Sequence, residues 1–317
     1  MEVVVIGCGV IGLSAAVRLQ EAGFPVRIIA RDLPPATTSS VAAAIWYPYR
    51  AYPQHRVLDW GRRTLAVFHE LAGERSAGIL LRDVTELFRF PTPDPWWLPA
   101  VDGIRRCTVD EVPPAYGGGL TFRTAVVEMP VYLRYLTMRF HAAGGRIEQG
   151  TLDSLAEAGA GAAAVVNCSG LGARQLTHDR QLLPIRGQVV LVENPGVDQV
   201  LLDESDPHAI TYVVPRSTDC VLGGTAEAGA KSLEPDVATA EAIVERCTKL
   251  EPRLAGARLL AHRVGLRPGR PAVRLEPDHL PDGTPCVHNY GHGGSGVTLS
   301  WGCADDVVGL IRAALPE

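Results

Sequence analysis

The chain has 317 residues, 46% of them hydrophobic and 21% charged, a composition typical of a globular protein that excludes a disordered or fibrous one. Its 30 basic and 35 acidic side chains give a net charge of −5 without a basic face, so we expect no nucleic-acid partner. No apolar run reaches the roughly 18 residues of a membrane span, so we expect no membrane partner and a cytoplasmic location. Seven cysteines without ligand spacing argue against a metal site.

The first 30 residues predict a β-α-β unit. Residues 3–6 form a short β-branched run, typical of a strand buried in a parallel sheet. A glycine-rich turn follows at residues 7–12, residues 13–22 predict a helix, and residues 25–30 predict a second strand. The length of the chain suggests that this unit belongs to one of two domains.

The glycine-rich turn has the spacing GxGxxG. Gly7 permits the tight turn, Gly9 lets the backbone approach a pyrophosphate, and Gly12 lets the helix pack on the strand. Asp32 lies 20 residues beyond Gly12, where an acidic residue holds the ribose hydroxyls, whereas Arg31 could instead receive the 2′-phosphate of NADP. These residues predict a dinucleotide site and leave FAD, NAD and NADP open.

The chain then leaves the regular α/β pattern. Residues 33–40 form a hydroxyl-rich loop, and the small residues after it suit close contact with a cofactor; an ordinary turn before a helix is the alternative. Residues 50–119 are rich in Pro, Trp and Arg and have no repeated βαβ pattern, which indicates a separate, mixed domain.

Later segments return to the first sheet. A helix is expected over residues 130–143, a strand from residue 146, and a buried parallel strand over residues 162–167, so the nucleotide domain is discontinuous. Three β-branched runs then predict antiparallel strands, and two further helices are expected. These runs are residues 188–192, 210–214 and 220–224, and the helices are residues 237–248 and 297–314.

The C-terminal stretch over residues 287–304 resembles the signature of the D-amino-acid oxidase family. Other stretches resemble the same family in the same order, so the resemblance spans essentially the whole chain. They are residues 7–14, 31–34, 167–170 and 265–271.

The resemblance implies an α/β fold: a Rossmann-type FAD-binding domain with a discontinuous second domain built on an antiparallel sheet. We assign residues 1–50, 130–180 and 268–317 to the FAD-binding domain, and residues 51–129 and 181–267 to the substrate-binding domain.

The resemblance also implies a reaction. FAD, held non-covalently, accepts a hydride at N5 from Cα of a D-amino acid, and O2 reoxidises it to give H2O2. The imino acid hydrolyses to a 2-oxo acid and ammonia. A small-molecule D-amino acid and O2 are therefore the expected partners, and we allow for a homodimer.

Catalytic residues follow from the same resemblance. Arg267 and Tyr212 correspond to the pair that binds the substrate carboxylate, although an arginine between apolar residues would by itself favour a structural ion pair. Gly294 corresponds to the residue whose carbonyl receives the substrate amino group. His208 stands where some members carry a lid tyrosine, which indicates a short or absent lid. The side-chain pocket is expected to be walled by Ile45, Tyr47 and Val214.

Residues 291–296 contain four glycines before the last predicted helix and form a second helix N-terminus, where Thr298 could help to stabilise negative charge on reduced flavin. His288 and His292 are not expected to act as a base or bind metal. The residues expected to bind FAD are Gly7, Gly9, Val10, Ile11, Gly12, Arg31, Asp32, Thr37, Thr38, Ser39, Ala44, Ile45, Ile147, Cys168, Ser169, Gly170, Gly293, Gly294, Gly296, Val297 and Thr298.

We expect neutral, mainly apolar D-amino acids as substrates. In D-aspartate oxidases of this family, an arginine that binds the distal carboxylate follows a Gly-Gly-Thr stretch, whereas Ala226 follows Thr225 here. Arg216 is the one nearby cation that could reach the same space. The alternatives are a D-aspartate oxidase or glycine oxidase of the same fold, or a non-catalytic flavin-binding redox sensor, which would need no carboxylate clamp.

Overall fold

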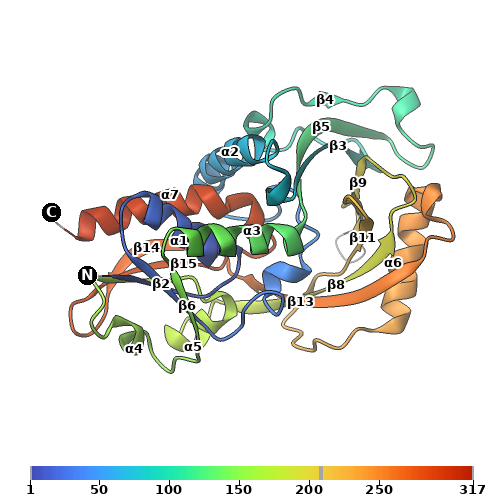
Figure 1. Cartoon of the computed structure of the whole chain (residues 1–317). Coiled ribbons are helices and arrows are strands. Elements are labelled where there is room, and N and C mark those ends of the chain that lie inside the picture. Colours follow the sequence, from blue (N-terminus) through green and yellow to red (C-terminus); the bar gives the residue numbers. More distant parts are fainter. Residues whose placement is uncertain (1, 207–209, 316–317) are drawn as a thin grey trace.

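Two sheets organise the chain, one in each lobe of the molecule (Figure 1). A computed structural model describes residues 2–206 and 210–315. Over these residues, the first sheet has six strands in the order β14-β15-β7-β1-β2-β6, and the second has nine. The α/β fold with a second, mainly antiparallel lobe is the one expected from the sequence.

The first sheet is parallel except at one edge. Val3 of β1 pairs with Val26 of β2 on one side and with Ala164 of β7 on the other, and β14 runs antiparallel beside β15. Its strands are β1 (Val3–Ile6), β2 (Val26–Ala30), β6 (Arg146–Gln149), β7 (Ala164–Asn167), β14 (Arg274–His279) and β15 (Pro285–Tyr290).

Helices cover both faces of this sheet because its strands are apolar on both sides. Val3 and Val5 belong to the core that includes Leu13 of α1, whereas Val4 packs with Leu155 of α4. The helices of this lobe are α1 (Val10–Glu21), α2 (Gln54–Leu71), α3 (Met129–Ala142), α4 (Leu155–Gly159), α5 (Ala173–Leu176) and α7 (Gly296–Ala314). None of the helices within residues 2–206 and 210–315 combines the length and the hydropathy needed to cross a membrane.

The second sheet is antiparallel apart from the β3–β9 pair. β8 pairs with β13 along one side and with β11 and β12 along the other, and the sheet continues from β11 through β10, β9, β3 and β5 to β4. Its strands are β3 (Ile79–Phe88), β4 (Arg105–Arg106), β5 (Gly118–Val127), β8 (Leu183–Glu193), β9 (Val200–Asp203), β10 (Thr211–Pro215), β11 (Asp219–Gly223), β12 (Glu227–Ala228) and β13 (Leu259–Gly269).

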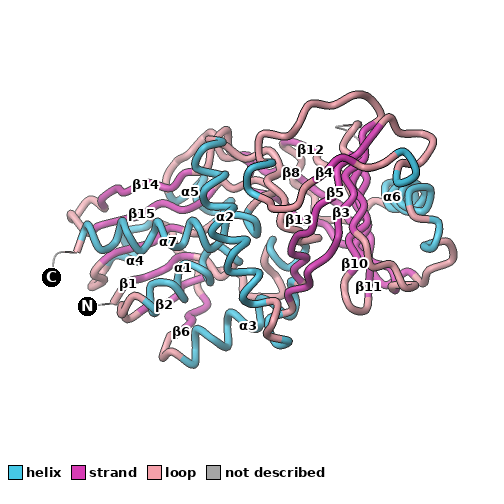
Figure 2. Tube along the Cα trace, turned by 90° about the horizontal axis from the view of Figure 1, so that it is seen from above, coloured by secondary structure: helices cyan, strands magenta, loops and turns pink. Residues whose placement is uncertain are grey.

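A single long helix, α6 (Val237–Leu250), covers the outer face of the second sheet (Figure 2). Ile243 and Cys247 of α6 pack there against Val190 and Val213. The inner face of the sheet is therefore left to meet the first lobe. Short 3-10 helices complete the fold: η1 (Thr38–Val41), η2 (Arg75–Ala77), η3 (Leu98–Ala100), η4 (Val109–Glu111), η5 (Gly170–Gly172) and η6 (Pro252–Leu254).

The sequence analysis located most of these elements and missed others. The strands β1, β2, β7, β8, β10 and β11 and the helices α3, α6 and α7 lie where they were predicted, within a few residues. Helix α1 begins at Val10, inside the glycine motif, rather than at residue 13. The β3–β5 pair and α2 lie in the segment that showed no pattern. The domain boundaries remain a prediction; α2 falls within residues 51–129 but packs on α7 of the first lobe.

Helices α2 and α7 approach so closely that only glycine fits at their contact. A β-carbon on Gly302 would lie 2.3 Å from the carbonyl oxygen of Trp60. We expect Gly302→Ala to lower the free energy of unfolding by roughly 1–3 kcal/mol, because backbone cannot yield as a flexible side chain can. Thermal unfolding measures the change.

Gly309 of the same helix provides the matched control. A β-carbon there has no neighbouring atom within 4 Å, so Gly309→Ala should leave stability unchanged or raise it by about 0.5–1 kcal/mol. Equal melting temperatures for the two variants would contradict the packing argument.

Candidate active site

A cavity of about 560 Å³ lies where the two lobes meet. Its walls include the carboxyl ends of β1, β2 and β7 from the first lobe, and β8, β10 and β13 from the second. Ligands of open α/β sheets bind at the carboxyl ends of the strands, so this is the expected place for a dinucleotide. The cavity is long enough to be lined both by the glycine-rich turn and by the residues expected to bind substrate.

The glycine-rich turn has the geometry that its spacing predicted. Gly7 has a φ of +108°, and a β-carbon on it would lie 2.5 Å from the carbonyl oxygen of Cys168. A β-carbon on Gly12 would lie 2.0 Å from the carbonyl oxygen of Gly7, so Gly12 packs beneath the turn rather than lining the cavity. The turn is held to η1 by Ser39, whose Oγ accepts a hydrogen bond from the Val10 amide (3.0 Å).

Arg31 and Asp32, the residues expected at the ribose, both line the cavity. Oδ2 of Asp32 accepts hydrogen bonds from Nε (3.0 Å) and Nη2 (2.6 Å) of Arg31. Because Asp32 balances the charge of Arg31, this pair does not favour a 2′-phosphate. Oδ1 of Asp32 stays available for ribose hydroxyls.

Unpartnered polar atoms in the cavity fit a polar cofactor. Nε2 of His292 is buried and has no hydrogen-bond partner among the described residues, and the buried amide of Asn289 meets only the thiol of Cys168 there; both side chains line the cavity. Burial lowers the pKa of His292 to about 3, so its ring is neutral. Buried polar groups are normally hydrogen-bonded, so these atoms indicate a ligand with several donors and acceptors, as FAD has.

Most of the residues expected to bind FAD line this cavity, with three exceptions. Gly12 lies beneath it, and Ile147 lines a second cavity instead. Thr298 is turned away, because its Oγ1 donates to the carbonyl of Tyr47 (2.9 Å) and accepts from the Tyr47 amide (3.1 Å). The hydroxyl of Thr298 therefore holds Tyr47 in the wall of the cavity, and a role of Thr298 toward FAD stays a prediction.

Several lining residues were missed. Gly150, Thr151 and Leu152 follow β6 and lie at the same sheet edge as the glycine turn. Their place directly after a parallel strand next to β2 was the available signal. Tyr49 and Glu204 also line the cavity, and no local motif marks either residue.

The predicted carboxylate pair comes together at the other end. Burial raises the pKa of the Tyr212 hydroxyl, while the charge of Arg267 and a hydrogen bond with it act in the opposite direction. Nη1 of Arg267 also donates to the carbonyl of Thr225 (2.9 Å). Gly294 is adjacent, since a β-carbon there would lie 3.7 Å from Cδ of Arg267. One end of the cavity can therefore hold both the carboxylate and the amino group of a substrate, next to the residues expected to bind them.

Two glycines make room for this pair. A β-carbon on Gly187 would lie 2.2 Å from Nη1 of Arg267, and one on Gly223 would lie 1.8 Å from Cζ of Tyr212. Gly223 is directly opposite Tyr212 in the β10–β11 ladder. The guanidinium of Arg267 thus lies directly over Gly187, and the phenol of Tyr212 lies directly over Gly223, because neither glycine has a side chain to displace them.

The side-chain pocket has an apolar wall and an acidic end. Ile45, Tyr47 and Val214 all line it, as expected. The hydroxyl of Tyr47 donates to Oε1 of Glu86 (2.8 Å), and the other oxygen of Glu86 is buried without a partner among the described residues. Burial raises the pKa of Glu86 to about 7, and burial together with the charge of Glu86 does the same for Glu204.

Two residues left open by the sequence analysis are absent from this pocket. Arg216 binds Asp219 through Nε (2.6 Å) and Nη2 (3.1 Å) and lines the second cavity, so it does not supply a cation for an acidic substrate. His208 lies outside the described residues.

The two histidines near the C-terminal glycines differ in surroundings. His288 is buried between Asp278 (Nε2 to Oδ2, 3.1 Å) and Asn167 (Nδ1 to Nδ2, 3.3 Å), which is a structural arrangement. In the described part of the chain, no group of three or more His, Cys, Asp or Glu side chains could hold a metal ion.

Comparison with known proteins identifies the family. The family model described as FAD dependent oxidoreductase matches residues 2–310. The chain belongs to this family. The family confirms FAD as the cofactor and the Rossmann-type fold that the sequence predicted.

Individual relatives of this FAD dependent oxidoreductase cover nearly its whole length. It is 60% identical to a D-amino-acid oxidase of Rubrobacter xylanophilus, over 98% of this chain and 96% of the relative. It is 46% identical to a D-amino-acid oxidase of Streptomyces coelicolor (98% and 96%) and 38% identical to the D-aspartate oxidase of Homo sapiens (98% and 94%). The structure of glycine oxidase from Geobacillus kaustophilus superposes with a TM-score of 0.83 at 20% identity, covering 98% and 94%, which shows a common fold.

The buried carboxyl of Glu86 predicts a pH-dependent stability. Its pKa is raised to about 7 in the folded chain, so between about pH 4.5 and pH 7 the folded state holds a proton that the unfolded state has released. Stability therefore falls as the pH rises through this range. Glu86→Gln cannot ionise, and we expect it to be more stable than the parent by about 1–3 kcal/mol at pH 8 and nearly equal near pH 4.5. Thermal unfolding across this range measures the difference.

The control is Glu241→Gln, which changes an exposed carboxyl of α6. It should give no pH-dependent difference from the parent. A Glu86→Gln curve parallel to the parent curve would show that Glu86 ionises normally.

Proposed function

We propose that this chain is a D-amino-acid oxidase for neutral, mainly apolar substrates. It converts a D-amino acid to an imino acid, electrons pass through FAD to O2 to give H2O2, and water hydrolyses the imino acid to a 2-oxo acid and ammonia. The observation that carries the proposal is the Arg267–Tyr212 pair beside Gly294. The D-amino-acid oxidases that are 60% and 46% identical to the chain support the same reaction.

Arg267 holds the substrate carboxylate. Its planar guanidinium can donate two parallel hydrogen bonds to a carboxylate, and its bond to the Thr225 carbonyl fixes its plane. Tyr212 donates to the same carboxylate from its hydroxyl, whose raised pKa keeps it protonated. These contacts determine where the rest of the substrate lies.

Gly294 then sets the orientation of Cα. Its carbonyl accepts a hydrogen bond from the substrate amino group, so carboxylate and amino group are both fixed and Cα–H has one direction. When bound, FAD supplies the hydride acceptor and the route for electrons to O2. The neutral ring of His292 adds no charge to this end of the cavity. The chain thus contributes mainly orientation, which can supply several kcal/mol of the barrier.

The pocket walls favour an apolar side chain over an acidic one. Ile45 and Val214 offer apolar contact. Glu204 lines the cavity and Glu86 stands behind Tyr47, so an aspartate side chain would meet two carboxyl groups. Among the described residues, Arg50 acts on Glu204 through its charge but does not line the cavity. Burying an unpaired carboxylate costs several kcal/mol. This arrangement argues against a D-aspartate oxidase, and the carboxylate pair argues against a flavin-binding redox sensor.

Three further expectations accompany this function. O2 as electron acceptor follows from the proposed oxidase chemistry. Seven free cysteines, six of them buried, suit a reducing compartment such as the cytoplasm. A homodimer remains a prediction from the family resemblance.

Replacing the carboxylate clamp should abolish most activity. Arg267→Met removes two charge-assisted hydrogen bonds of about 1.5 kcal/mol each, so kcat/KM should fall on the order of 100-fold. Peroxide release with D-valine measures activity, and the visible absorbance of the purified variant measures retained FAD, which should be unchanged.

Arg312→Met is the matched control, because Arg312 is exposed near the end of α7, far along the chain from the clamp. It should retain parent activity. A change of less than about threefold in Arg267→Met would show that Arg267 is not the carboxylate receptor.

Substrate preference provides an independent prediction. We expect kcat/KM for D-valine, D-methionine and D-phenylalanine to exceed that for D-aspartate. Glu204 lines the cavity, and the two arginines among its described lining residues, Arg31 and Arg267, are assigned to the cofactor and to the α-carboxylate of the substrate. All four should be measured in one buffer at one oxygen tension. A D-aspartate value above the other three would contradict the electrostatic argument while leaving the oxidase reaction itself intact.

A further inference from the structure

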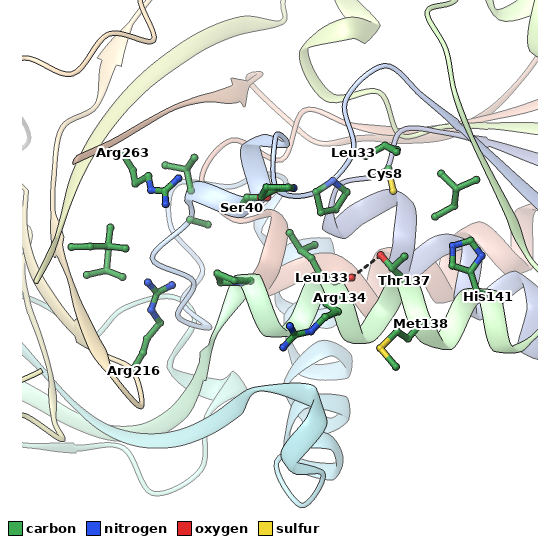
Figure 3. A pocket seen from close by; sticks show the side chains of 18 residues that line it. Cys8, Leu33, Ser40, Leu133, Arg134, Thr137, Met138, His141, Arg216 and Arg263 are labelled. Atoms are coloured by element: carbon green, nitrogen blue, oxygen red, sulfur yellow. Dashed lines mark hydrogen bonds between the residues drawn. The ribbon is translucent and has the colours of Figure 1, made fainter. Parts of the chain in front are cut away.

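A second cavity of about 660 Å³ lies beside the first, with which it shares lining residues. Figure 3 shows the side chains that line it. Cys8, Val41 and Ala42 line both cavities, so the glycine-rich turn and the end of η1 lie between them. η1 is docked on β13: Oγ1 of Thr38 donates to the carbonyl of Leu266 (3.2 Å), and Val41 packs against Gly265. The second cavity therefore adjoins the space assigned to FAD and substrate and has a further wall of its own on α3.

Most of the wall of this second cavity is apolar. Leu33 and Pro34 come from the loop after β2, Leu133 from α3, and Leu191 and Val221 from the second sheet. Its volume lies within the range of cavities that hold small organic ligands, which is about 300–1,000 Å³. The side chain of Met138, 65% exposed, lies at its edge, so the cavity is reached from solvent along α3.

Three arginines give the cavity a positive charge. Arg134 extends from α3, and Arg216 and Arg263 extend from the second sheet across the gap (Figure 3). The residues that line the cavity include no Asp or Glu. Within residues 2–206 and 210–315, Arg134 and Arg263 have no ion-pair partner, and Arg216 binds Asp219 through Nε and Nη2, leaving Nη1.

Arg134 and Arg263 are exposed, whereas Arg216 is buried and its charge is balanced by Asp219. The guanidinium groups of Arg134 and Arg263 therefore have donors free for an anion at the cavity. Their planar forks match the oxygens of a phosphate, and a dianion balances more of their charge than a single carboxylate does.

We propose that the second cavity binds an organic phosphate with an apolar ring body. The ring lies against Leu133, Leu191 and Val221, and the phosphate is held by Arg134, Arg216 and Arg263. Because the glycine-rich turn and the end of η1 lie between the two cavities, the ligand binds while FAD is in place. The proposal stands apart from the oxidase reaction and does not depend on it.

Isothermal titration calorimetry of the FAD-loaded protein with 1-naphthyl phosphate tests the proposal. We expect one saturable site with a dissociation constant below about 1 mM. Two matched probes separate the contributions: 1-naphthol keeps the ring without the anion, and inorganic phosphate keeps the anion without the ring. 1-Naphthol and inorganic phosphate should each bind at least about tenfold more weakly than 1-naphthyl phosphate, because the first lacks the anion and the second lacks the ring. Absence of saturable binding, or equal binding of 1-naphthol, would overturn the proposal.

Variants locate the site. Arg134→Met and Arg263→Met should each weaken binding on the order of 10-fold, the effect of one charge-assisted hydrogen bond. Both residues are exposed, so the variants should fold, which their melting temperature and FAD content check. Arg312→Met and Arg267→Met should bind like the parent. Binding that survives in Arg263→Met and Arg134→Met, or that is lost in Arg267→Met, would place the probe elsewhere and overturn the assignment.

Discussion

The short helix η1 joins the two lobes, and both cavities depend on how it is held. Oγ of Ser39 accepts a hydrogen bond from the Val10 amide (3.0 Å), which ties η1 to the glycine turn of the first lobe. On its other side, Oγ1 of Thr38 donates to the carbonyl of Leu266 (3.2 Å) on β13. Arg267 is the next residue of that strand. Two side-chain hydrogen bonds therefore fix the nucleotide turn relative to the carboxylate clamp.

The two cavities differ in the charged side chains around them, and this difference favours different ligands. In the first, Glu204 and Glu86 lie at the side-chain end, opposite the cation of Arg267. The proposed substrate, a zwitterion with a neutral side chain, would match this order, because its carboxylate would meet the cation and its side chain would bring no charge to the acidic end. In the second, Arg134 and Arg263 are left without a counter-ion in the described chain. Low-dielectric clefts strengthen such fields, so the sign of charge selects the ligand.

The features that could be predicted from the sequence are those encoded by neighbouring residues. The βαβ unit and its glycines needed only local spacing, and a family signature located Arg267 and Tyr212. Glu86 could not be found this way, because its function in the pocket depends on the fold bringing β3 opposite Tyr47. Ile147 was expected from the family resemblance to bind FAD, whereas its side chain lines the second cavity. Which side chains share a face depends on tertiary packing.

Side chains of β8 point alternately to the two faces of the second sheet, and this explains why both cavities lie on one face. Gly187 and Val189 line the first cavity and Leu191 lines the second, whereas Val190 and Val192 pack in the core under α6. Because side chains alternate along a strand, a shift of one residue in the pairing of β8 would turn the glycine away and place a β-carbon beneath the guanidinium. The core under α6 resists that shift, since it would expose apolar side chains to the cavities. The buried face of β8 under α6 thereby fixes the pairing register of the strand. That register keeps Gly187 beneath the guanidinium of Arg267 on the opposite face.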